Sequence, residues 1–246
     1  VTPNKKAFSG DLAHYQAIME AARASGSRCF YETTVGAALP VIQTVQDFRE
    51  TGDRVRSVSG IFSGTLAYLF NLYDGSKPFS ALLADALEQG FTEPDPRDDL
   101  SGMDVARKLV IVARELGHKV GLDDVNVESL VPAGLTDVSV AEFMAGIHGI
   151  DDEMLGRLRA AEDNGAVLRY IGTLSEDGAL RVALTEVPRT SAFANLALTD
   201  NLVQIQSDRY SDNPLVIQGP GAGPAVTAGG VFADLLRLSA QLGNRR

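Results

Sequence analysis

The segment 90–108 holds the residues whose types and spacing could support chemistry. Four acidic residues fall within seven positions there, at Glu93, Asp95, Asp98 and Asp99. Two interspersed prolines favour a stiff, non-helical turn around the first two of these acids. Because like charges at this spacing repel one another, we expect the segment to form an exposed loop or to surround a cationic group.

An aspartate and a lysine follow the acidic segment on an expected helix. Ser101 and Asp104 have the spacing of a capping box, which predicts a helix over 102–116. Asp104 and Lys108 share one face of that helix, and the apolar run 109–113 predicts that it lies in a core. Partial desolvation would lower the pKa of Lys108 while Asp104 would oppose that shift, a balance that suits proton transfer. The alternative is an ordinary surface ion pair worth about 0.3 to 0.5 kcal/mol, which spacing alone favours.

The composition excludes several classes of protein. The chain has 246 residues, 45% of them hydrophobic, and a net charge of −10 that argues against nucleic acid and anionic membranes as partners. No apolar run approaches the roughly 18 residues of a membrane helix, and no signal-peptide core begins the chain. A single cysteine, Cys29, fits a reducing cytoplasm, and three dispersed histidines do not support a zinc site.

The periodicity of apolar residues predicts an α+β fold with a mostly antiparallel sheet and helices on one face. A hairpin signal, Glu176-Asp177-Gly178, separates two of the expected strands. The strands are expected at 28–34, 55–61, 167–175, 179–187, 202–207 and 215–218. The further helices are expected at 11–24, 41–50, 65–74, 78–89, 140–146, 151–164 and 226–242.

The glycine-rich segment 219–223 lies between the last expected strand and the last helix. It is not a dinucleotide-binding fingerprint, because Pro224 stands where the third glycine would be. No Gly-x-Gly-x-x-Gly precedes the first helix, and the residues before that helix are too few for a βαβ unit. By its residues alone this segment predicts a tight turn from strand to helix.

Several blocks of sequence resemble the homoserine dehydrogenases, in the order in which that family carries them. The most specific is the segment 90–108, Gly-Phe-Thr-Glu-Pro-Asp-Pro-Arg-Asp-Asp-Leu-Ser-Gly-Met-Asp-Val-Ala-Arg-Lys. The resemblance implies NAD(P)-dependent interconversion of L-homoserine and L-aspartate 4-semialdehyde, in the biosynthesis of threonine and methionine, by a homodimer. The other blocks are Asn4–Ala7, Tyr31–Pro40, Gly60–Thr65 and Gly219–Gly223 with Thr227 and Ala228.

The resemblance also implies roles for individual residues. Lys108 would protonate the developing alkoxide of the substrate, and Lys5 would be its partner near the carbonyl and the cofactor. Glu93 and Asp99 would bind the substrate ammonium, and Asp104 would bind the substrate hydroxyl or orient Lys108. Phe91 departs from a tyrosine found in many relatives. Thr65 would lie near the substrate, although a simple helix cap is an alternative for it.

The cofactor and a cation would have sites of their own. The resemblance implies that NADP or NAD lies close to Gly223, Gly90 and Lys5. It further implies that a monovalent cation such as sodium is held by backbone carbonyls, those of Glu32, Val35, Ala37 and Leu39. From the residues alone, the same small-residue segment predicts only a packing turn.

The expected organisation is that of part of a longer enzyme. Segments 1–27 and 219–246 would be remnants of a Rossmann-type nucleotide-binding domain, 28–41 and 165–218 a dimerisation sheet, and 42–164 the catalytic, substrate-binding region. The resemblance is to the dehydrogenase part of a bifunctional aspartate kinase and homoserine dehydrogenase, or to a short monofunctional form. The first of these implies a kinase fused to the chain or associated with it. A non-catalytic dimerisation and binding module is one alternative, and an acidic loop that binds a divalent cation is another, although its spacing lacks the calcium-loop pattern.

Overall fold

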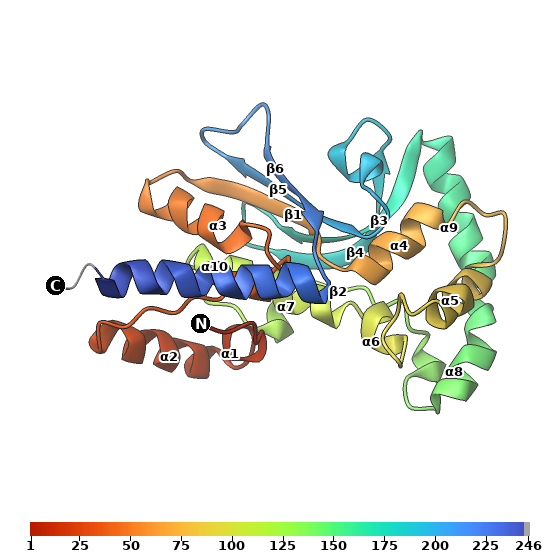
Figure 1. Ribbon diagram of the computed structural model, residues 1–246. Coiled ribbons are helices and arrows are strands. Elements are labelled where there is room, and N and C mark those ends of the chain that lie inside the picture. The colour runs from red at the N-terminus through yellow and green to blue at the C-terminus, as the bar shows by residue number, and fades with distance from the viewer. Residues whose placement is uncertain (244–246) are drawn as a thin grey trace.

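A six-stranded sheet forms one layer of the computed structural model, which describes residues 1–243 (Figure 1). The strand order is β2-β4-β3-β1-β5-β6, and only β2 is parallel to its neighbour, β4. The predicted α+β fold with a mostly antiparallel sheet is therefore confirmed. The strands are β1 (Val55–Ile61), β2 (Val125–Val127), β3 (Ala166–Leu174), β4 (Leu180–Pro188), β5 (Asp200–Ser207) and β6 (Leu215–Pro220).

The main helices begin and end within two residues of the predicted positions. Within residues 1–243, no helix combines the length and the apolarity that a membrane span requires. Short 3-10 turns occur at Glu32–Thr34, Leu122–Asp124, Ala133–Leu135, Ile147–Ile150 and Ala192–Asn195. The helices are α1 (Lys6–Ser9), α2 (Leu12–Ala24), α3 (Val41–Glu50), α4 (Gly64–Leu72), α5 (Phe79–Glu88), α6 (Arg97–Leu100), α7 (Met103–Glu115), α8 (Val140–Gly146), α9 (Asp151–Asp163) and α10 (Pro224–Gly243).

The helices cover one face of the sheet, as predicted. Alternate residues of each strand point to opposite faces, so Val58 and Ile205, which are partners in the sheet, join the large core beneath the helices. Helices α3, α4, α5, α7 and α9 complete that core. A smaller cluster on the other face, which includes Ile61 and Leu202, is covered by the segment around Phe193.

Helix α7 lies at the centre of the large core and also holds the N-terminal segment. Arg114, near its end, is 3% exposed. Its guanidinium donates hydrogen bonds to the backbone carbonyls of Phe8, Gly10 and Val120 at 2.7–2.9 Å. A buried guanidinium needs such acceptors, because unpaired donors in a core are costly. Arg114 thereby fixes α1, and the lysine that precedes it, against α7.

The predicted strand at 28–34 is wrong. Residues 28–31 are irregular and lead into the 3-10 turn Glu32–Thr34, so the segment 28–41 contributes no strand to the sheet. The Glu32 carboxylate explains the bend, because it accepts hydrogen bonds from the backbone N–H groups of Ile42 and Gln43 at the start of α3. Strand β1 instead occupies the position between β3 and β5. The division of the chain into domains otherwise stays a prediction.

The predicted capping box at Ser101 and Asp104 is also wrong. The Ser101 hydroxyl donates to the carbonyl of Asp98, and Asp104 forms ion pairs instead of capping the helix. Gly102 precedes α7 with a φ of 73°, and a Cβ there would lie 2.1 Å from the hydroxyl oxygen of Tyr170. Gly102 therefore packs closely against a buried tyrosine at the start of α7, and the Ser101 hydroxyl accepts a hydrogen bond from the N–H of Met103 instead of that of Asp104.

Glu115, the last residue of α7, is buried and gives a testable pH dependence. Burial raises its pKa from 4.5 to about 7. The Tyr31 hydroxyl and the side-chain amide of Gln46 donate hydrogen bonds to its carboxylate. Between these two pKa values the folded protein holds a proton that the unfolded chain has lost. The free energy of unfolding should therefore fall as the pH rises through this window.

We expect Glu115→Gln to flatten the dependence of the melting temperature on pH between about 5 and 8, because the glutamine does not titrate. At about 1.4 kcal/mol per pH unit, the effect on the free energy of unfolding is at most about 3 kcal/mol. Scanning calorimetry measures it, and Glu88→Gln, at an exposed position of α5, is the matched control. Parallel pH curves for the wild type and Glu115→Gln would contradict the prediction.

Candidate active site

One cavity of about 640 Å³ contains all seven residues predicted to bind substrate or cofactor or to catalyse. Its walls come from the N-terminal segment, the start of α4, the loop before α6, the first turns of α7 and the turn before α10. These parts are far apart in the sequence, so the fold brings the predicted residues together. The seven are Lys5, Gly90, Glu93, Asp99, Asp104, Lys108 and Gly223.

Lys108 is buried at the inner end of the cavity, with 8% of the residue exposed. Its ammonium lies 2.8 Å from the Asp104 carboxylate and donates a hydrogen bond to the backbone carbonyl of Phe62. Burial lowers the pKa of Lys108, and Asp104 opposes the shift without cancelling it. The alternative of an ordinary surface ion pair is therefore wrong, because this ammonium has little contact with solvent.

Asp104 joins two lysines from distant parts of the chain. One carboxylate oxygen lies 2.7 Å from Lys5, and the other lies 2.8 Å from Lys108. Burial acts to raise the pKa of Asp104, but the two ammonium groups outweigh it and the pKa falls to about 2. Asp104 is therefore ionised at neutral pH. The side chain of Lys5 is 34% exposed, so it lies nearer the cavity mouth than Lys108.

The four acids of the loop before α7 divide into two pairs. Glu93 and Asp99 line the cavity, and the Asp99 carboxylate accepts a hydrogen bond from the backbone N–H of Glu93 at 2.8 Å. Burial raises the pKa of Asp99. Asp95 is instead paired with Arg97, and it lines a separate pocket together with Asp98. Only one pair can therefore meet a ligand in this cavity.

The alternative of a divalent-cation site is not supported. Within residues 1–243, no group of three or more His, Cys, Asp or Glu side chains is placed to hold a metal ion. The Asp95 carboxylate is occupied by two nitrogens of Arg97, which explains how the loop tolerates its acids. The acidic loop is thus stabilised internally by an arginine and by backbone N–H groups.

Two contacts hold the acidic loop against α4. The Thr65 hydroxyl donates a hydrogen bond to the backbone carbonyl of Phe91 at 2.8 Å. The Phe91 ring stacks on Tyr68 with 4.2 Å between the ring centres. The ring of Phe91 is therefore used in packing, and a tyrosine hydroxyl is not needed for this contact. Thr65 lines the cavity, and the preceding Ser63 caps α4 by accepting from the N–H of Leu66.

The turn between residues 35 and 39 carries the backbone carbonyls predicted to hold a cation. Gly36 and Ala37 both have positive φ, at 75° and 53°, so this turn directs successive carbonyls differently from a helix. Val35 and Ala37 are buried, and within residues 1–243 their carbonyls accept no hydrogen bond. The adjacent Thr33 hydroxyl is also buried without a partner in that part of the chain. These groups could bind a small cation.

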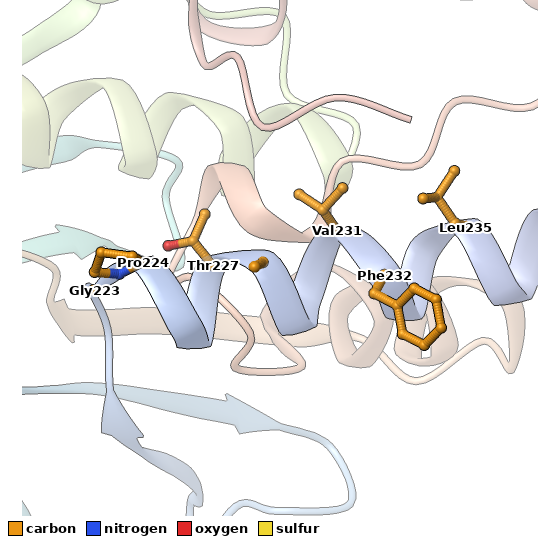
Figure 2. Close-up of a pocket in the computed structure, with 7 residues that line it drawn as sticks. Gly223, Pro224, Thr227, Val231, Phe232 and Leu235 are labelled. Carbon is orange, nitrogen blue, oxygen red and sulfur yellow. The ribbon is translucent and has the colours of Figure 1, made fainter.

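A second hollow of about 760 Å³ runs along the exposed side of α10 (Figure 2). Val231 and Leu235 project from the same side of the helix, and Phe232 points away from them. Phe232 is 60% exposed, which is unusual for so large an apolar side chain. Gly223 and Thr227 line both this hollow and the cavity, so an occupant of the hollow would lie beside the candidate active site.

Sequence reasoning missed three groups of this site, of which the Phe62 carbonyl contacts Lys108 directly. The Phe62 carbonyl is a backbone atom and leaves no signal in side-chain types. Asn201 lies in β5, where it reads as one more polar residue of an alternating strand. Thr199 lines the cavity from the segment just before that strand. Only the pairing of β1 with β5 brings these residues toward α7.

We expect Asp99→Ala to loosen the acidic loop, because it removes the acceptor of the Glu93 backbone N–H. Hydrogen exchange at this amide should speed up by about tenfold or more, the size expected for losing one hydrogen bond of about 1.5 kcal/mol. Hydrogen–deuterium exchange measures it directly. Asp98→Ala, at an exposed neighbouring position, is the control and should leave the rate unchanged. Equal exchange rates in the two variants would count against this role of Asp99.

The chain is similar in sequence to named proteins over its whole length. It is 49% identical over 245 residues to maize (Zea mays) bifunctional aspartokinase/homoserine dehydrogenase 2, chloroplastic, covering 99% of this chain and 27% of that protein. It is 45% identical to the homoserine dehydrogenase of Emericella nidulans, covering 98% of this chain and 69% of the relative. The chain thus spans about a quarter of the bifunctional relative's length.

Solved structures share the fold. A Candida auris protein of unknown function has a TM-score of 0.93 at 41% identity, covering 97% of this chain and 69% of that one. A hyperthermophilic archaeal homoserine dehydrogenase in complex with NADPH has a TM-score of 0.73 at 20% identity, covering 98% and 63%. The family model described as homoserine dehydrogenase matches residues 40–236. The chain therefore belongs to the homoserine dehydrogenase family.

Proposed function

We propose that this chain carries the substrate-binding and proton-transfer part of an enzyme that interconverts L-homoserine and L-aspartate 4-semialdehyde. The observation that carries the proposal is the single cavity in which Lys5, Asp104 and Lys108 face the acidic pair Glu93 and Asp99. This arrangement combines a proton donor in a partly dry site with anions that match the ammonium of an amino acid.

Lys108 is the proposed acid in the direction of aldehyde reduction and the base in the direction of homoserine oxidation. A general acid works best when its pKa lies near the working pH, and burial lowers the pKa of Lys108 toward that range. The nicotinamide cofactor, when bound, supplies or accepts the hydride. Asp104 keeps the ammonium of Lys108 in place, and Lys5, at the mouth, adds positive charge beside the substrate oxygen.

Glu93 and Asp99 are the proposed partners of the substrate ammonium. Both line the same cavity as Lys5 and Lys108. An amino acid held by its ammonium at this loop would extend its side chain toward Lys108. This orientation is the reason to place the reacting carbon, and not the α-carbon, next to the proton donor.

Gly90 and Gly223 are the proposed points of close approach for NADP or NAD, together with Lys5. Both glycines have positive φ, at 75° and 112°, and open space where a Cβ would lie. A flat ring could therefore approach the backbone there, so these residues fit the cofactor. The archaeal relative bound to NADPH supports the same class of cofactor. NADP and NAD both remain within the proposal.

The remaining parts of a nucleotide-binding domain are proposed to pack on the apolar side of α10. The exposed Phe232, Leu235 and Leu236 support this, because several large apolar side chains exposed on one helix are usually covered in the assembled protein. Residues 1–27 and 219–246 are the proposed remnants of that domain. Helices α1, α2 and α10 lie together on the same side of the molecule in Figure 1.

A monovalent cation such as sodium is proposed to bind the carbonyls of Glu32, Val35, Ala37 and Leu39. Unpaired carbonyls inside a protein are costly, and a bound cation would satisfy them. The carbonyls of Val35 and Ala37 fit this role directly, whereas those of Glu32 and Leu39 each already accept one backbone hydrogen bond, from Val35 and Val41, and would offer the cation their second lone pair. The carboxylate of Glu32 does not take part, because it caps α3.

A homodimer is the proposed assembly, formed through the sheet face that the helices leave open. Its outward positions on β1 and β5, such as Ser59 and Gln204, are polar and only half-buried. Fusion to an aspartate kinase is a further proposal for the whole protein: the maize relative is named as bifunctional and the E. nidulans relative as homoserine dehydrogenase alone. The proposed location is the cytoplasm, although the maize relative is named as chloroplastic.

We expect Lys108→Ala in the full-length protein to lower kcat for aldehyde reduction by at least about a hundredfold, because it removes the proton donor. The far-UV circular dichroism spectrum should be retained. In the wild type, kcat for reduction should fall as the pH rises through the pKa of Lys108, which lies below its ordinary value. Stopped-flow absorbance of NADPH measures both effects. Lys119→Ala, at an exposed position, is the control, and wild-type turnover by Lys108→Ala would refute the assignment.

A further inference from the structure

Asn201 is a buried polar residue that directly contacts an acceptor of the Lys108 ammonium. It lies near the start of β5 and is 1% exposed. Its side-chain N–H group, Nδ2, donates a hydrogen bond to the carbonyl oxygen of Phe62 at 3.3 Å. The same oxygen accepts a hydrogen bond from Lys108. One backbone carbonyl thus serves two donors, one from the catalytic helix and one from the sheet.

The orientation of the Asn201 amide follows from its partner. A carbonyl oxygen can only accept, so the amide must present Nδ2 to Phe62, and the flipped amide would place two oxygens against each other. The Asn201 Oδ1 atom is then buried, and it has no partner within residues 1–243. An orphaned oxygen opposes stability, so the fold gains little from this asparagine as a structural residue. What Asn201 supplies is the donor to Phe62.

Gly221 leaves the space that this contact requires. A Cβ at position 221 would lie 2.0 Å from Cγ and 2.1 Å from Nδ2 of Asn201. No side chain could occupy that position without displacing the amide. The turn before α10 therefore packs its backbone directly on the Asn201 amide group. The absence of a side chain at Gly221 thus has a physical reason independent of backbone conformation.

We propose that Asn201 is a positioning residue that holds the Phe62 carbonyl as a fixed acceptor for Lys108. It does not touch the substrate, since it is not part of the cavity wall, and it acts only through Phe62. This inference rests on the proposed role of Lys108 in proton transfer.

The geometry explains how Asn201 would act on the reaction. A lysine ammonium has three N–H donors. One is directed to Asp104 and one to Phe62, which leaves the third for a ligand in the cavity. A carbonyl oxygen has two lone pairs, so Asn201 can occupy one without displacing Lys108 from the other. Loss of the Asn201 donor would let the peptide group of Phe62 tilt. The third N–H of the Lys108 ammonium would then no longer be directed at a ligand in the cavity.

The test compares the pH dependence of aldehyde reduction in full-length Asn201→Asp and wild type. An aspartate has nearly the size of the asparagine, but when ionised it removes the donor to Phe62 and places a negative charge one carbonyl group away from the Lys108 ammonium. It should therefore favour the protonated lysine and move the alkaline limb of the kcat profile up by about one pH unit. Asn126→Asp makes the same chemical change at an exposed position of β2 and should leave the limb in place.

A second variant keeps the inference falsifiable if Asn201→Asp does not fold. Asn201→Ala removes the donor without adding charge, and it should lower kcat about tenfold while KM stays within about twofold. A role in folding alone would lower the melting temperature without moving the limb or kcat. An unmoved limb in folded Asn201→Asp, or wild-type kcat in Asn201→Ala, would overturn the inference.

Lys108→Ala separates failure of this inference from failure of the proposed function. If Lys108→Ala abolishes the alkaline limb and Asn201→Asp leaves it in place, the positioning role is wrong and the proton-transfer role stands. If Lys108→Ala keeps both the limb and wild-type turnover, the proton-transfer role is wrong, and the positioning role falls with it.

Discussion

The candidate active site depends on one carboxylate, that of Asp104, which lies between the ammonium groups of Lys5 and Lys108. Each lysine reaches it from a differently anchored part of the fold. Lys108 belongs to a helix buried in the core, and Lys5 precedes a short helix that the buried Arg114 holds in place. If either lysine were not held in place, the two ammonium groups would not both contact the Asp104 carboxylate.

Two opposing effects act on the Lys108 ammonium. Removal from water favours the neutral amine, while Asp104 favours the charged form, and the first effect is the larger. Asp104 shows the opposite balance, because two lysines outweigh its own partial burial. The outcome is a carboxylate that stays ionised beside an amine that can lose its proton. This asymmetry is what a site for reversible proton transfer requires.

The other parts of the candidate site support the pair formed by Asp104 and Lys108. In the acidic loop Arg97 pairs with Asp95, and the Asp99 carboxylate accepts a hydrogen bond from the backbone N–H of Glu93, which leaves the Glu93 carboxylate available at the cavity. The backbone turns at Gly90 and Gly223 leave open space beside the lysines. Backbone geometry and side-chain charge therefore converge on one cavity, although its residues are far apart in the sequence.

Local patterns in the sequence were sufficient for most helices and strands. The run of apolar residues after Lys108 predicted a buried helix, and the alternating runs on either side of Glu176 predicted the hairpin of β3 and β4. The predicted strand at 28–34 failed because Glu32 turns back to cap α3, a contact that no local pattern contains. The charged site residues could be located from sequence motifs, because they lie close together along the chain or in blocks that resemble a family.

The groups that complete the site were beyond sequence reasoning. The carbonyl of Phe62 has no side-chain signature, and Asn201 reaches it only because β1 and β5 are paired. The capping box at Ser101 was plausible by spacing, but Asp104 binds two cations more strongly than it could bind a helix N-terminus. Contacts between segments far apart in the sequence, and not local propensity, therefore determine these parts of the site.

The most direct test of this account is the pKa of Lys108 itself, followed by NMR of its ¹³Cε signal during a pH titration. We expect a wild-type pKa below the ordinary lysine value, a lower pKa in Asp104→Asn and a higher one in Lys5→Met, because Asp104 favours the ammonium and Lys5 opposes it. Unchanged titration of Lys108 in both variants would contradict the central claim that Asp104 links the two lysines.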